Sequence, residues 1–597
     1  MRAVEEVVEG RAETRPPAPE PRRRRADLWA LLSYGLLAVL VLSRLWRDPS
    51  GRVLAGNDDD HGFFMFVMAH GERVLFHGDN PLFSDRMNVP DGINMMANTT
   101  VLALSVPFAP VTHWLGAGVT VVLLLTLGLA GTAAAWYWVL SRHLVQSRVA
   151  AWIGGLWCGF CPAMVSHANG HVNFVSLFVV PFIVWQVLRL REPGRAVRGG
   201  VILALLIVVQ VFLNEEILLF TALALGVFVI AYALMVPARA KREARPLLAG
   251  LGVAAPISLA LLAYPLYFQF TGPGSYSGQP FLPDKFATDL ASLAGFARQS
   301  LAGTDELARR MSVSSTEDNT FFGPVGLVMI VAAVVVLWRS AAARAAAISA
   351  FVLLVVSMGP SLKVFGSDTG VPLPFGLVSH VPIIDLVSVT RFAMVPATIA
   401  GVLLALATDR MRGFTPRGRR LWAVGLVLAL VPMAPKPLPV FDADPMPSFI
   451  AQGTWRQYVT EGRTLVTVPL PEVTYGRDGV RWPALTNLEY SSPRGYFMGP
   501  LDPPDDITGS WNAPRRFSSD LLWRVQQYGE RPRLSASDKA RITDDLVFWR
   551  AAVVVLVPGT TNEGPLLDTL TAALGEPQQV GGVRLWDVRS LPVPSNE

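Results

Sequence analysis

Long apolar blocks alternate with short polar segments along most of this chain. A helix that crosses a membrane needs about 20 consecutive, mainly apolar residues, and the blocks approach that length. The pattern therefore predicts an α-helical polytopic membrane protein with about eleven transmembrane helices. The predicted spans are 27–45, 119–140, 149–166, 172–188, 199–213, 217–236, 247–269, 322–338, 343–359, 391–408 and 420–435.

Arginine and lysine occur mainly in every second loop between these blocks, and such loops face the cytoplasm in membrane proteins. Residues 1–26 are predicted to be a disordered, basic cytoplasmic tail that ends in four arginines. This places the N-terminus in the cytoplasm and everything after residue 436 outside. The other basic loops contain Arg142 and Arg148; Arg189, Arg191, Arg195 and Arg198; Arg239, Lys241, Arg242 and Arg245; Arg339 and Arg344; and Arg410, Arg412, Arg417, Arg419 and Arg420.

The first outer loop, residues 46–118, is long and rich in Phe, Met, Leu and Trp, which is typical of a folded segment. Within it, residues 100–116 are apolar but short and contain Pro107 and Pro110. Counting this stretch as a span would place the next basic loop outside and invert every loop after it. We therefore predict an interfacial or re-entrant segment.

A Pro-rich stretch near 432–447 marks the end of the membrane bundle, which occupies residues 27–436. Beyond it, the runs RTLVTVPLP, AAVVVLVPG and VRLWDV predict buried strands, and SSDLLWRVQQYGE and ASDKARITDDLVFW predict capped helices. Residues 437–597 are thus predicted to form an extracytoplasmic α/β domain. This segment shows no nucleophile elbow, phosphate loop or metal-ligand cluster, so we expect it to stabilise the protein or to position an acceptor.

The composition agrees with a membrane protein, since 51% of the residues are hydrophobic and only 16% are charged, against roughly 25% charged in a soluble domain. The formal net charge of +5 lies mainly in the short loops, so it reflects topology and not nucleic-acid binding. The two cysteines, Cys158 and Cys161, lie inside an apolar block. They are predicted to be buried side chains, and a disulfide framework is excluded.

Polar residues that packing does not explain lie at the predicted outer ends of the spans. The first outer loop contains Asp58, Asp59, Asp60 and His61, followed at once by apolar residues. Adjacent carboxylates repel one another unless a metal, a basic side chain or solvent balances them. A solvated charged face is one interpretation of this run, and a site on an interface helix is the other.

The turn between the third and fourth spans contains His167, His171 and Asn173, and the turn between the fifth and sixth contains Glu215 and Glu216. Histidines four residues apart can bind a metal from one helical face, or they can satisfy a helix end. Acidic residues at membrane depth are costly and suggest function, unless they are exposed at the lipid–water interface.

Arg391, at the outer mouth of the tenth span, can hold a phosphate through a bidentate contact, or it can anchor the helix. Because these groups share one face of the membrane, they could form one site that combines carboxylates for acid–base chemistry with a cation for an anionic group. Weaker phosphate candidates in the outer loop 270–321 are Lys285, Arg298, Arg309 and Arg310.

With these motifs, the sequence resembles the membrane-embedded C-type glycosyltransferases, the GT-C superfamily, and within it a bacterial branch of predicted glycosyltransferases. The matching stretches are GNDDDHGFFMF, HGDNPLF, VPDGINMMANTT, SHANGHVNF, NEEILLF and VTRFAMVP, in order over about residues 56–400. The C-terminal segment is matched only in its placement.

The resemblance implies an inverting membrane glycosyltransferase, of hexosyl or pentosyl type, for cell-wall biogenesis. The donor would be a sugar on a polyprenyl phosphate in the membrane lipid, and the acceptor an extracytoplasmic glycan, lipid or protein of the cell envelope. The family's first outer loop supplies the general base, which corresponds here to Asp60, supported by Asp58 and Asp59. The implied substrate-binding residues are His61, His167, His171, Asn173, Glu215, Glu216 and Arg391. No cofactor is required, but His61 stands where the family often has Pro, which leaves room for a divalent metal.

Two alternatives come from other functional classes. A transporter or flippase of polar lipids would commonly contain internal repeats and helices broken at the membrane midplane, but the sequence shows no repeat and its polar groups lie at one face. A non-catalytic protein of envelope assembly would bind partners through the outer domain. Loss of turnover in Asp60→Asn, with folding and lipid binding retained, would favour the enzyme.

Overall fold

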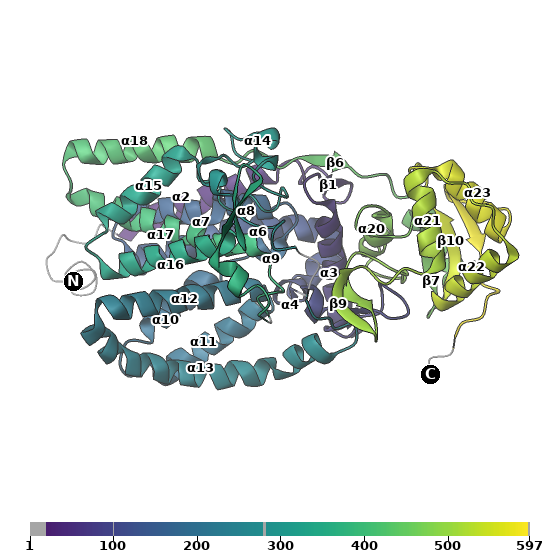
Figure 1. Ribbon diagram of the computed structural model, residues 1–597, viewed down its shortest axis with the longest axis horizontal. Helices are drawn as coiled ribbons and strands as arrows, with labels where there is room; N and C mark the ends of the chain where they lie inside the picture. Colours follow the sequence, from purple (N-terminus) through teal and green to yellow (C-terminus); the bar gives the residue numbers. More distant parts are fainter. Residues whose placement is uncertain (1–19, 100, 279–281, 382, 595–597) are drawn as a thin grey trace.

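The computed structural model describes residues 20–99, 101–278, 282–381 and 383–594. A bundle of helices forms the larger part, and a smaller part built around a sheet lies beyond one end of it (Figure 1). Most of the predicted tail over 1–26 lies outside the described residues. The first helix, α2 (Glu20–Val41), begins inside that predicted tail and continues through the first predicted span.

A helix lies at each of the predicted span positions. Five helical stretches of the described residues are long and apolar enough to cross a membrane, and four shorter apolar helices accompany them, as expected of a multi-pass membrane protein. The bundle helices after α2 are α6 (Ala117–Val139), α7 (Arg148–Phe160), α8 (Pro162–His167), α9 (Val172–Val175), α10 (Val180–Arg189), α11 (Ala196–Val211), α12 (Glu215–Met235), α13 (Pro237–Thr271), α15 (Pro324–Val336), α16 (Ala341–Ser357), α17 (Met394–Arg410) and α18 (Pro416–Met433).

Two of the predicted spans are interrupted rather than continuous. Cys161 is extended between α7 and α8, and Pro162 occupies the first position of α8, where its missing N–H costs nothing. The chain then turns at Gly170, whose φ of +106° favours glycine, and α9 ends after a single turn. These interruptions create a corner of the backbone that carries His167 and His171.

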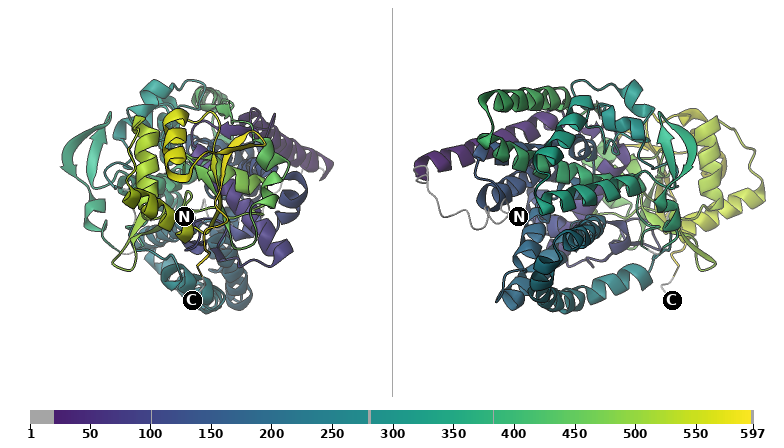
Figure 2. Two further views of the ribbon diagram at one scale, coloured as in Figure 1. Left: turned by 90° about the vertical axis from the view of Figure 1, so that its right-hand side faces the viewer. Right: turned by 60° about the vertical axis from the view of Figure 1, so that its left-hand side comes forward.

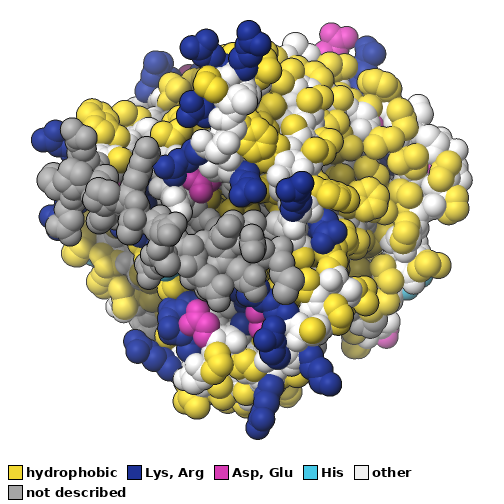
Figure 3. Space-filling model, turned by 90° about the vertical axis from the view of Figure 1, so that its left-hand side faces the viewer, with side chains coloured by type: hydrophobic (Ala, Val, Ile, Leu, Met, Phe, Trp, Pro, Cys, Tyr) yellow, Lys and Arg dark blue, Asp and Glu magenta, His cyan; other side chains and the backbone are white. Residues whose placement is uncertain are grey.

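The two ends of the bundle differ in charge. We call the end that faces the sheet the sheet end and the opposite end the arginine end (Figures 1 and 2). Figure 3 shows the arginine end, where Lys and Arg side chains gather around the face. The basic segments at this end are 142–148, 189–198, 239–245, 339–344 and 410–420, of which 239–245 forms the first turns of α13.

The first outer loop folds against the sheet end of the bundle. Its main element is α3 (Asp58–His77), which is buried along most of its length. Of the predicted interfacial segment, the described residues 101–116 contain two short helices, α4 (Leu102–Ser105) and α5 (Ala109–Leu115), and neither is long enough to cross a membrane. A side chain at Gly71 would lie 2.6 Å from the Ser105 backbone, so glycine lets α3 pack closely here.

Beyond the bundle, four strands form a mixed sheet in the order β11–β12–β10–β7, with β10 parallel to β7 and antiparallel to β12. Alternate residues of β10 pack on opposite faces of the sheet, which explains its unbroken apolar run. The chain enters this part through β6 (Val440–Asp442), which pairs with β1 (Arg52–Leu54). The elements are β7 (Thr464–Val468), α20 (Asp478–Leu485), α21 (Phe517–Tyr528), α22 (Ala536–Phe548), β10 (Ala551–Leu556), α23 (Glu563–Leu574), β11 (Gln578–Val580) and β12 (Val583–Asp587).

Candidate active site

Asp60 lies in the first turn of α3, at the sheet end. The side chain of Asn57 caps this helix by accepting the Asp60 backbone N–H at 3.4 Å. The Asp60 carboxylate has three side-chain partners. Its Oδ2 lies 2.7 Å from His171 Nε2 and accepts Asn57 Nδ2 at 2.5 Å, and its Oδ1 accepts the Tyr496 hydroxyl at 3.0 Å. About a fifth of the side chain, 21%, is exposed.

These partners determine the ionisation of Asp60. Burial alone would raise the pKa of this carboxyl group, because it disfavours the charged form. The charge of His171 and the hydrogen bonds from His171, Asn57 and Tyr496 outweigh burial and lower the pKa to about 2. Asp60 is therefore a carboxylate at neutral pH.

The other two aspartates of the run are held by a cation from beyond the bundle. Arg477, just before α20, donates from Nε to Asp58 Oδ2 at 2.8 Å, and its Nη1 lies 2.5 Å from Asp59 Oδ1. Arg477 thus balances the charge of Asp58. At Asp59 burial outweighs the nearby Arg477 and raises the pKa of the carboxyl group to about 8.

The corner of α8 and α9 brings its two histidines together beside Asp60. His167 Nδ1 lies 2.8 Å from His171 Nδ1. Nε2 of the fully buried His167 has no hydrogen-bond partner among the described residues. One donor atom each from His167, His171 and Glu317 lie within 4.8 Å of one another. Two imidazoles and a carboxylate suit a divalent metal such as zinc or manganese.

Arg391 continues this chain of contacts on the other side of Glu317. Its guanidinium group lies between two carboxylates, at 3.0 Å from Glu317 Oε1 and 2.9 Å from Glu216 Oε2, and over the ring of Phe174. Asp60, the two histidines, Glu317, Arg391 and Glu216 therefore form one continuous polar cluster at the sheet end. The structure brings together groups from five separate segments, four of which the sequence placed on one common face.

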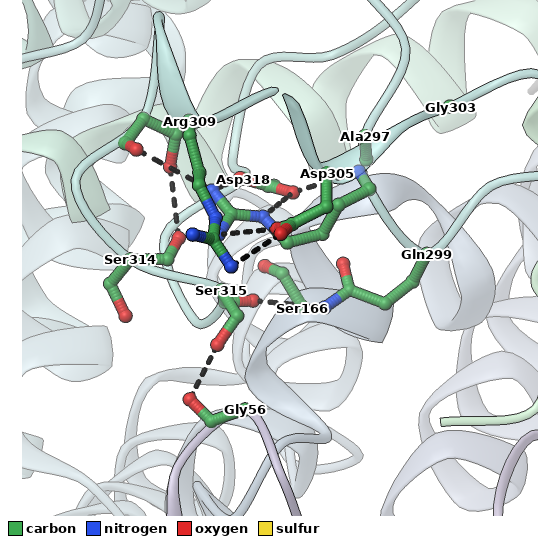
Figure 4. A network of polar contacts seen from close by, with 12 residues as sticks. Gly56, Ser166, Ala297, Gln299, Gly303, Asp305, Arg309, Ser314, Ser315 and Asp318 are labelled. Carbon is green, nitrogen blue, oxygen red and sulfur yellow. Dashed lines mark hydrogen bonds and ion pairs between the residues drawn. The ribbon is translucent and has the colours of Figure 1, made fainter. Parts of the chain in front are cut away.

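The loop that delivers Glu317 is tied to both sides of this cluster (Figure 4). The Ser315 hydroxyl donates to the Gly56 carbonyl at 2.5 Å, and the Ser166 hydroxyl donates to the Thr316 carbonyl at 3.2 Å. Asp318, next in the chain, is fully buried and pairs with Arg298 at 3.0 Å. Glu317 is therefore positioned by a network that also contacts the segments of Asp60 and His167.

Two predicted site residues, Glu215 and His61, have partners outside the cluster, and a third, Asn173, shows no contact with it among the described residues. Glu215 accepts a hydrogen bond from Gln269 at 2.9 Å. His61 accepts the Leu54 backbone N–H at 3.3 Å, and burial lowers its pKa to about 4. Asn173 is buried, and its Oδ1 has no hydrogen-bond partner among the described residues.

The four phosphate candidates of the long outer loop lie outside the polar cluster. Arg298 pairs with Asp318, Arg309 with Asp305 and Arg310 with Glu306. For Lys285 the described residues show only backbone hydrogen bonding.

Four residues of the site were not among the predicted ones: Asn57, Glu317, Arg477 and Tyr496. Asn57 stands in the GNDDDH motif, and its helix-capping residue type was a usable signal. Glu317 stands in the polar run SSTEDN of the long outer loop, where only the basic residues were considered. Arg477 and Tyr496 carry no local signal.

A mainly apolar cavity of about 1000 Å³ runs through the bundle between α6, α10, α12, α16 and α17. At the sheet end its lining includes Ile217 and Met394, which follow Glu216 and Arg391 closely in the chain. At the arginine end it reaches Arg410. The cavity therefore connects the neighbourhood of the polar cluster with the opposite end of the bundle.

No protein-family model matches this sequence, and no curated protein matches it. Among solved structures, the arabinofuranosyltransferase AftD from Mycobacteria has a similar fold, with a TM-score of 0.58 at 15% identity. The similarity covers 95% of this chain and 40% of the AftD chain, so this chain spans about two fifths of the length of that protein. The oligosaccharyltransferase of Archaeoglobus fulgidus is also similar, with a TM-score of 0.51 at 12% identity, over 89% of this chain and 69% of that one. These similarities show that the chain shares its fold with these two structures.

Proposed function

We propose that this protein is a membrane glycosyltransferase that moves a sugar from a polyprenyl-phosphate donor to an extracytoplasmic acceptor, with inversion at the anomeric carbon. The observation that carries the proposal is Asp60, an ionised and firmly oriented carboxylate at the sheet end of a fold similar to that of a glycosyltransferase. Hexosyl and pentosyl donors both fit this chemistry, and the acceptor can be a glycan, lipid or protein of the cell envelope.

In the proposed reaction the acceptor hydroxyl attacks the anomeric carbon from the side opposite the phosphate. The new carbon–oxygen bond forms as the anomeric carbon–phosphate oxygen bond breaks, and the polyprenyl phosphate leaves with the bonding electrons. Asp60 accepts the hydrogen bond of the attacking hydroxyl and takes its proton as bond formation makes that hydroxyl acidic. Since the pKa of Asp60 is low, proton transfer is expected late in this step.

The proposed topology places the sheet end outside and the arginine end in the cytoplasm, since basic loops stay inside. The N-terminus is then cytoplasmic and residues 437–597 are extracytoplasmic. The apolar cavity supports a lipid-linked donor, because it offers about 1000 Å³ for an isoprenoid chain directly below the polar cluster. The phosphate would then lie near Arg391.

The charges around Arg391 favour an additional cation in the site. Arg391 already pairs with Glu216 and Glu317, so the three groups together carry a net negative charge that would repel a phosphate. We propose that His167, His171 and Glu317 hold a divalent metal, which the buried His167 Nε2, without a hydrogen-bond partner among the described residues, supports. A metal ligand is a neutral imidazole, so the charge of the metal would take the place of the proton charge on His171 beside Asp60. Such a metal would supply charge neutralisation for the leaving phosphate.

Replacement of Asp60 tests the proposal. Asp60→Asn keeps the size of the side chain but removes its charge, and loss of a general base typically costs about 100- to 10000-fold in rate. The assay follows release of labelled polyprenyl phosphate from synthetic polyprenyl-phosphoryl arabinofuranose and polyprenyl-phosphoryl mannose. Asp85→Asn is the matched control, because Asp85 lies exposed in the same outer loop. Wild-type turnover in Asp60→Asn would refute the proposal as stated, whereas failure of the wild-type protein to release polyprenyl phosphate would favour a flippase or an assembly protein.

A further inference from the structure

Two side chains from the C-terminal part of the chain reach the first turn of α3. Tyr496 donates its hydroxyl hydrogen to Asp60 Oδ1 at 3.0 Å. Arg477 binds Asp58 at 2.8 Å through Nε and Asp59 at 2.5 Å through Nη1. Each carboxylate of the aspartate run therefore has a partner that comes from beyond the bundle.

The hydroxyl of Tyr496 is aimed by the surroundings of its ring. The ring stacks on Trp511, with 5.1 Å between the centroids, and meets the edge of Phe63 at 6.2 Å. Two residues further on, the Met498 backbone exchanges two hydrogen bonds with the Asn98 side chain, at 2.6 and 2.8 Å. These contacts fasten the segment to the first outer loop, so the tyrosine has little freedom to turn away.

The guanidinium group of Arg477 is held just as firmly by its own loop. Its Nη1 donates to the backbone carbonyls of Glu472, at 2.9 Å, and Val473, at 2.5 Å. The Glu472 carboxylate in turn binds the buried Arg494 at 3.1 Å and Arg515 at 2.9 Å. The loop that presents Arg477 is therefore rigid, and the arginine has fixed directions for its remaining N–H groups.

These contacts leave the two carboxylate oxygens of Asp60 with different numbers of hydrogen-bond partners. Oδ2 is engaged by His171 and Asn57, whereas Oδ1 receives only Tyr496 among the described residues. A carboxylate oxygen can accept two hydrogen bonds, so Oδ1 retains room for an acceptor hydroxyl. Meanwhile Arg477 holds the two neighbouring carboxyl groups, at 2.8 Å from Asp58 and 2.5 Å from Asp59, so that they are not free to compete with Asp60 for the same hydroxyl.

We propose that Tyr496 and Arg477 are positioning residues of the active site, Tyr496 by orienting the Asp60 carboxylate and Arg477 by binding Asp58 and Asp59. This inference rests on the proposed function, since it assumes that Asp60 accepts the proton of the acceptor. The C-terminal part of the chain then completes the site, and catalysis requires it to remain seated on α3.

The first test is a double-mutant cycle between Tyr496 and Asp60. Tyr496→Phe removes one hydrogen bond to a charged group, and we expect kcat to fall about 10- to 100-fold with little change in the KM for donor. In an Asp60→Asn background the same change is expected to cost almost nothing more, because the two groups act together. Tyr490→Phe is the matched control, since this buried tyrosine of the same region has a hydroxyl without a hydrogen-bond partner among the described residues.

The second test compares two replacements of Arg477. Arg477→Met removes the cation, and we expect a loss of kcat similar to that of Tyr496→Phe. Arg477→Lys is expected to recover part of the activity, because an ammonium group supplies the charge but lacks the fixed fork by which Nε and Nη1 reach the two carboxyl groups. Arg531→Met, at an exposed ion pair with Asp568, should behave like wild type.

The outcomes separate this inference from the proposed function. Wild-type turnover in Asp60→Asn would refute the proposed function itself. If Asp60→Asn is inactive but Tyr496→Phe keeps the wild-type kcat, Tyr496 does not act through Asp60. The same conclusion follows if the residual kcat of the double variant falls by the product of the two single-variant losses. If Arg477→Met has the same kcat as the wild type, Arg477 is not a positioning residue of the site.

Discussion

Removal of Arg298 tests whether the loop that delivers Glu317 is fastened as the structure indicates. Arg298 binds Asp318 through Nε and Nη2, both at 3.0 Å, and its backbone N–H adds a third bond of the same length. The Asp318 side chain has no exposed surface. Arg298→Ala leaves this carboxylate buried beside a single backbone donor from residue 298.

The cost follows from the burial of the partner that remains. Removing one member of a buried ion pair typically lowers the free energy of unfolding by about 3–5 kcal/mol, because the other charge stays buried without compensation. The bidentate geometry of this pair places the expected loss in that range. The pair of Arg310 with Glu306 is the contrast, since both side chains are largely exposed, and such surface pairs contribute about 0.5 kcal/mol or less.

The loss of unfolding free energy in Arg298→Ala should also depend on pH. Burial raises the pKa of Asp318, and Arg298 partly offsets this effect. Without Arg298 the pKa rises further, so the buried group prefers the protonated form. A carboxyl group whose pKa is higher in the folded than in the unfolded state stabilises the fold at low pH and loses that contribution as pH rises through the folded value. The free energy of unfolding of Arg298→Ala is therefore expected to fall further below that of the wild type at pH 8 than at pH 5.5.

Thermal unfolding of the detergent-solubilised protein, followed by tryptophan fluorescence at both pH values, measures these differences. Arg298→Ala should unfold at a clearly lower temperature than Arg310→Ala. Adding Asp318→Asn should recover much of the loss and abolish its pH dependence, because no charge is then buried. The reasoning is refuted if the two arginine variants unfold alike, or if the deficit of Arg298→Ala grows as pH falls.

Three further predictions concern the polar cluster and the cavity. Arg391→Gln leaves two glutamates without their cation and should lower the thermal stability strongly, whereas Arg420→Gln, at an exposed position of the arginine end, should not. Plasma mass spectrometry should find about one divalent metal per chain, with at least half of it lost in His167→Ala; a metal content unchanged by that substitution would disprove the site. Ala346→Trp fills the cavity and should raise the KM for a long-chain donor, whereas Ile348→Trp, exposed on the same helix, should leave it unchanged.

The hydrophobic pattern predicted the positions of the bundle helices because each span carries its own signal, a block of apolar residues of nearly fixed length. It missed the interruptions at Cys161 and Ser176 because the surrounding residues stay apolar across both breaks. An apolar corner and an apolar helix have the same composition when both are buried. Pro162 was the one local sign of the first break, since proline cannot continue a helix in its usual hydrogen bonding.

The site could be predicted in part, because polar residues inside apolar sequence stand out. Asp60, His171, Glu216 and Arg391 were found in this way, and the structure joins them through Glu317. The role of each was harder to predict than its presence. A lone arginine near a membrane surface suggests a free cation for phosphate, and only the folded structure shows that two carboxylates already surround it.

Tyr496 and Arg477 mark where sequence reasoning must end for this protein. Tyr496 and Arg477 lie 436 and 419 residues from their partners in the aspartate run. The residue type alone does not indicate which distant carboxylate a tyrosine or an arginine will contact. The unbalanced charge of the aspartate run did require a cation, but electrostatics alone could not distinguish a metal, solvent or a side chain. The packing of α20 and its neighbouring loops on α3 determines that the cation is a side chain. A site formed between remote segments is therefore specified by the packing of those segments and not by a sequence motif.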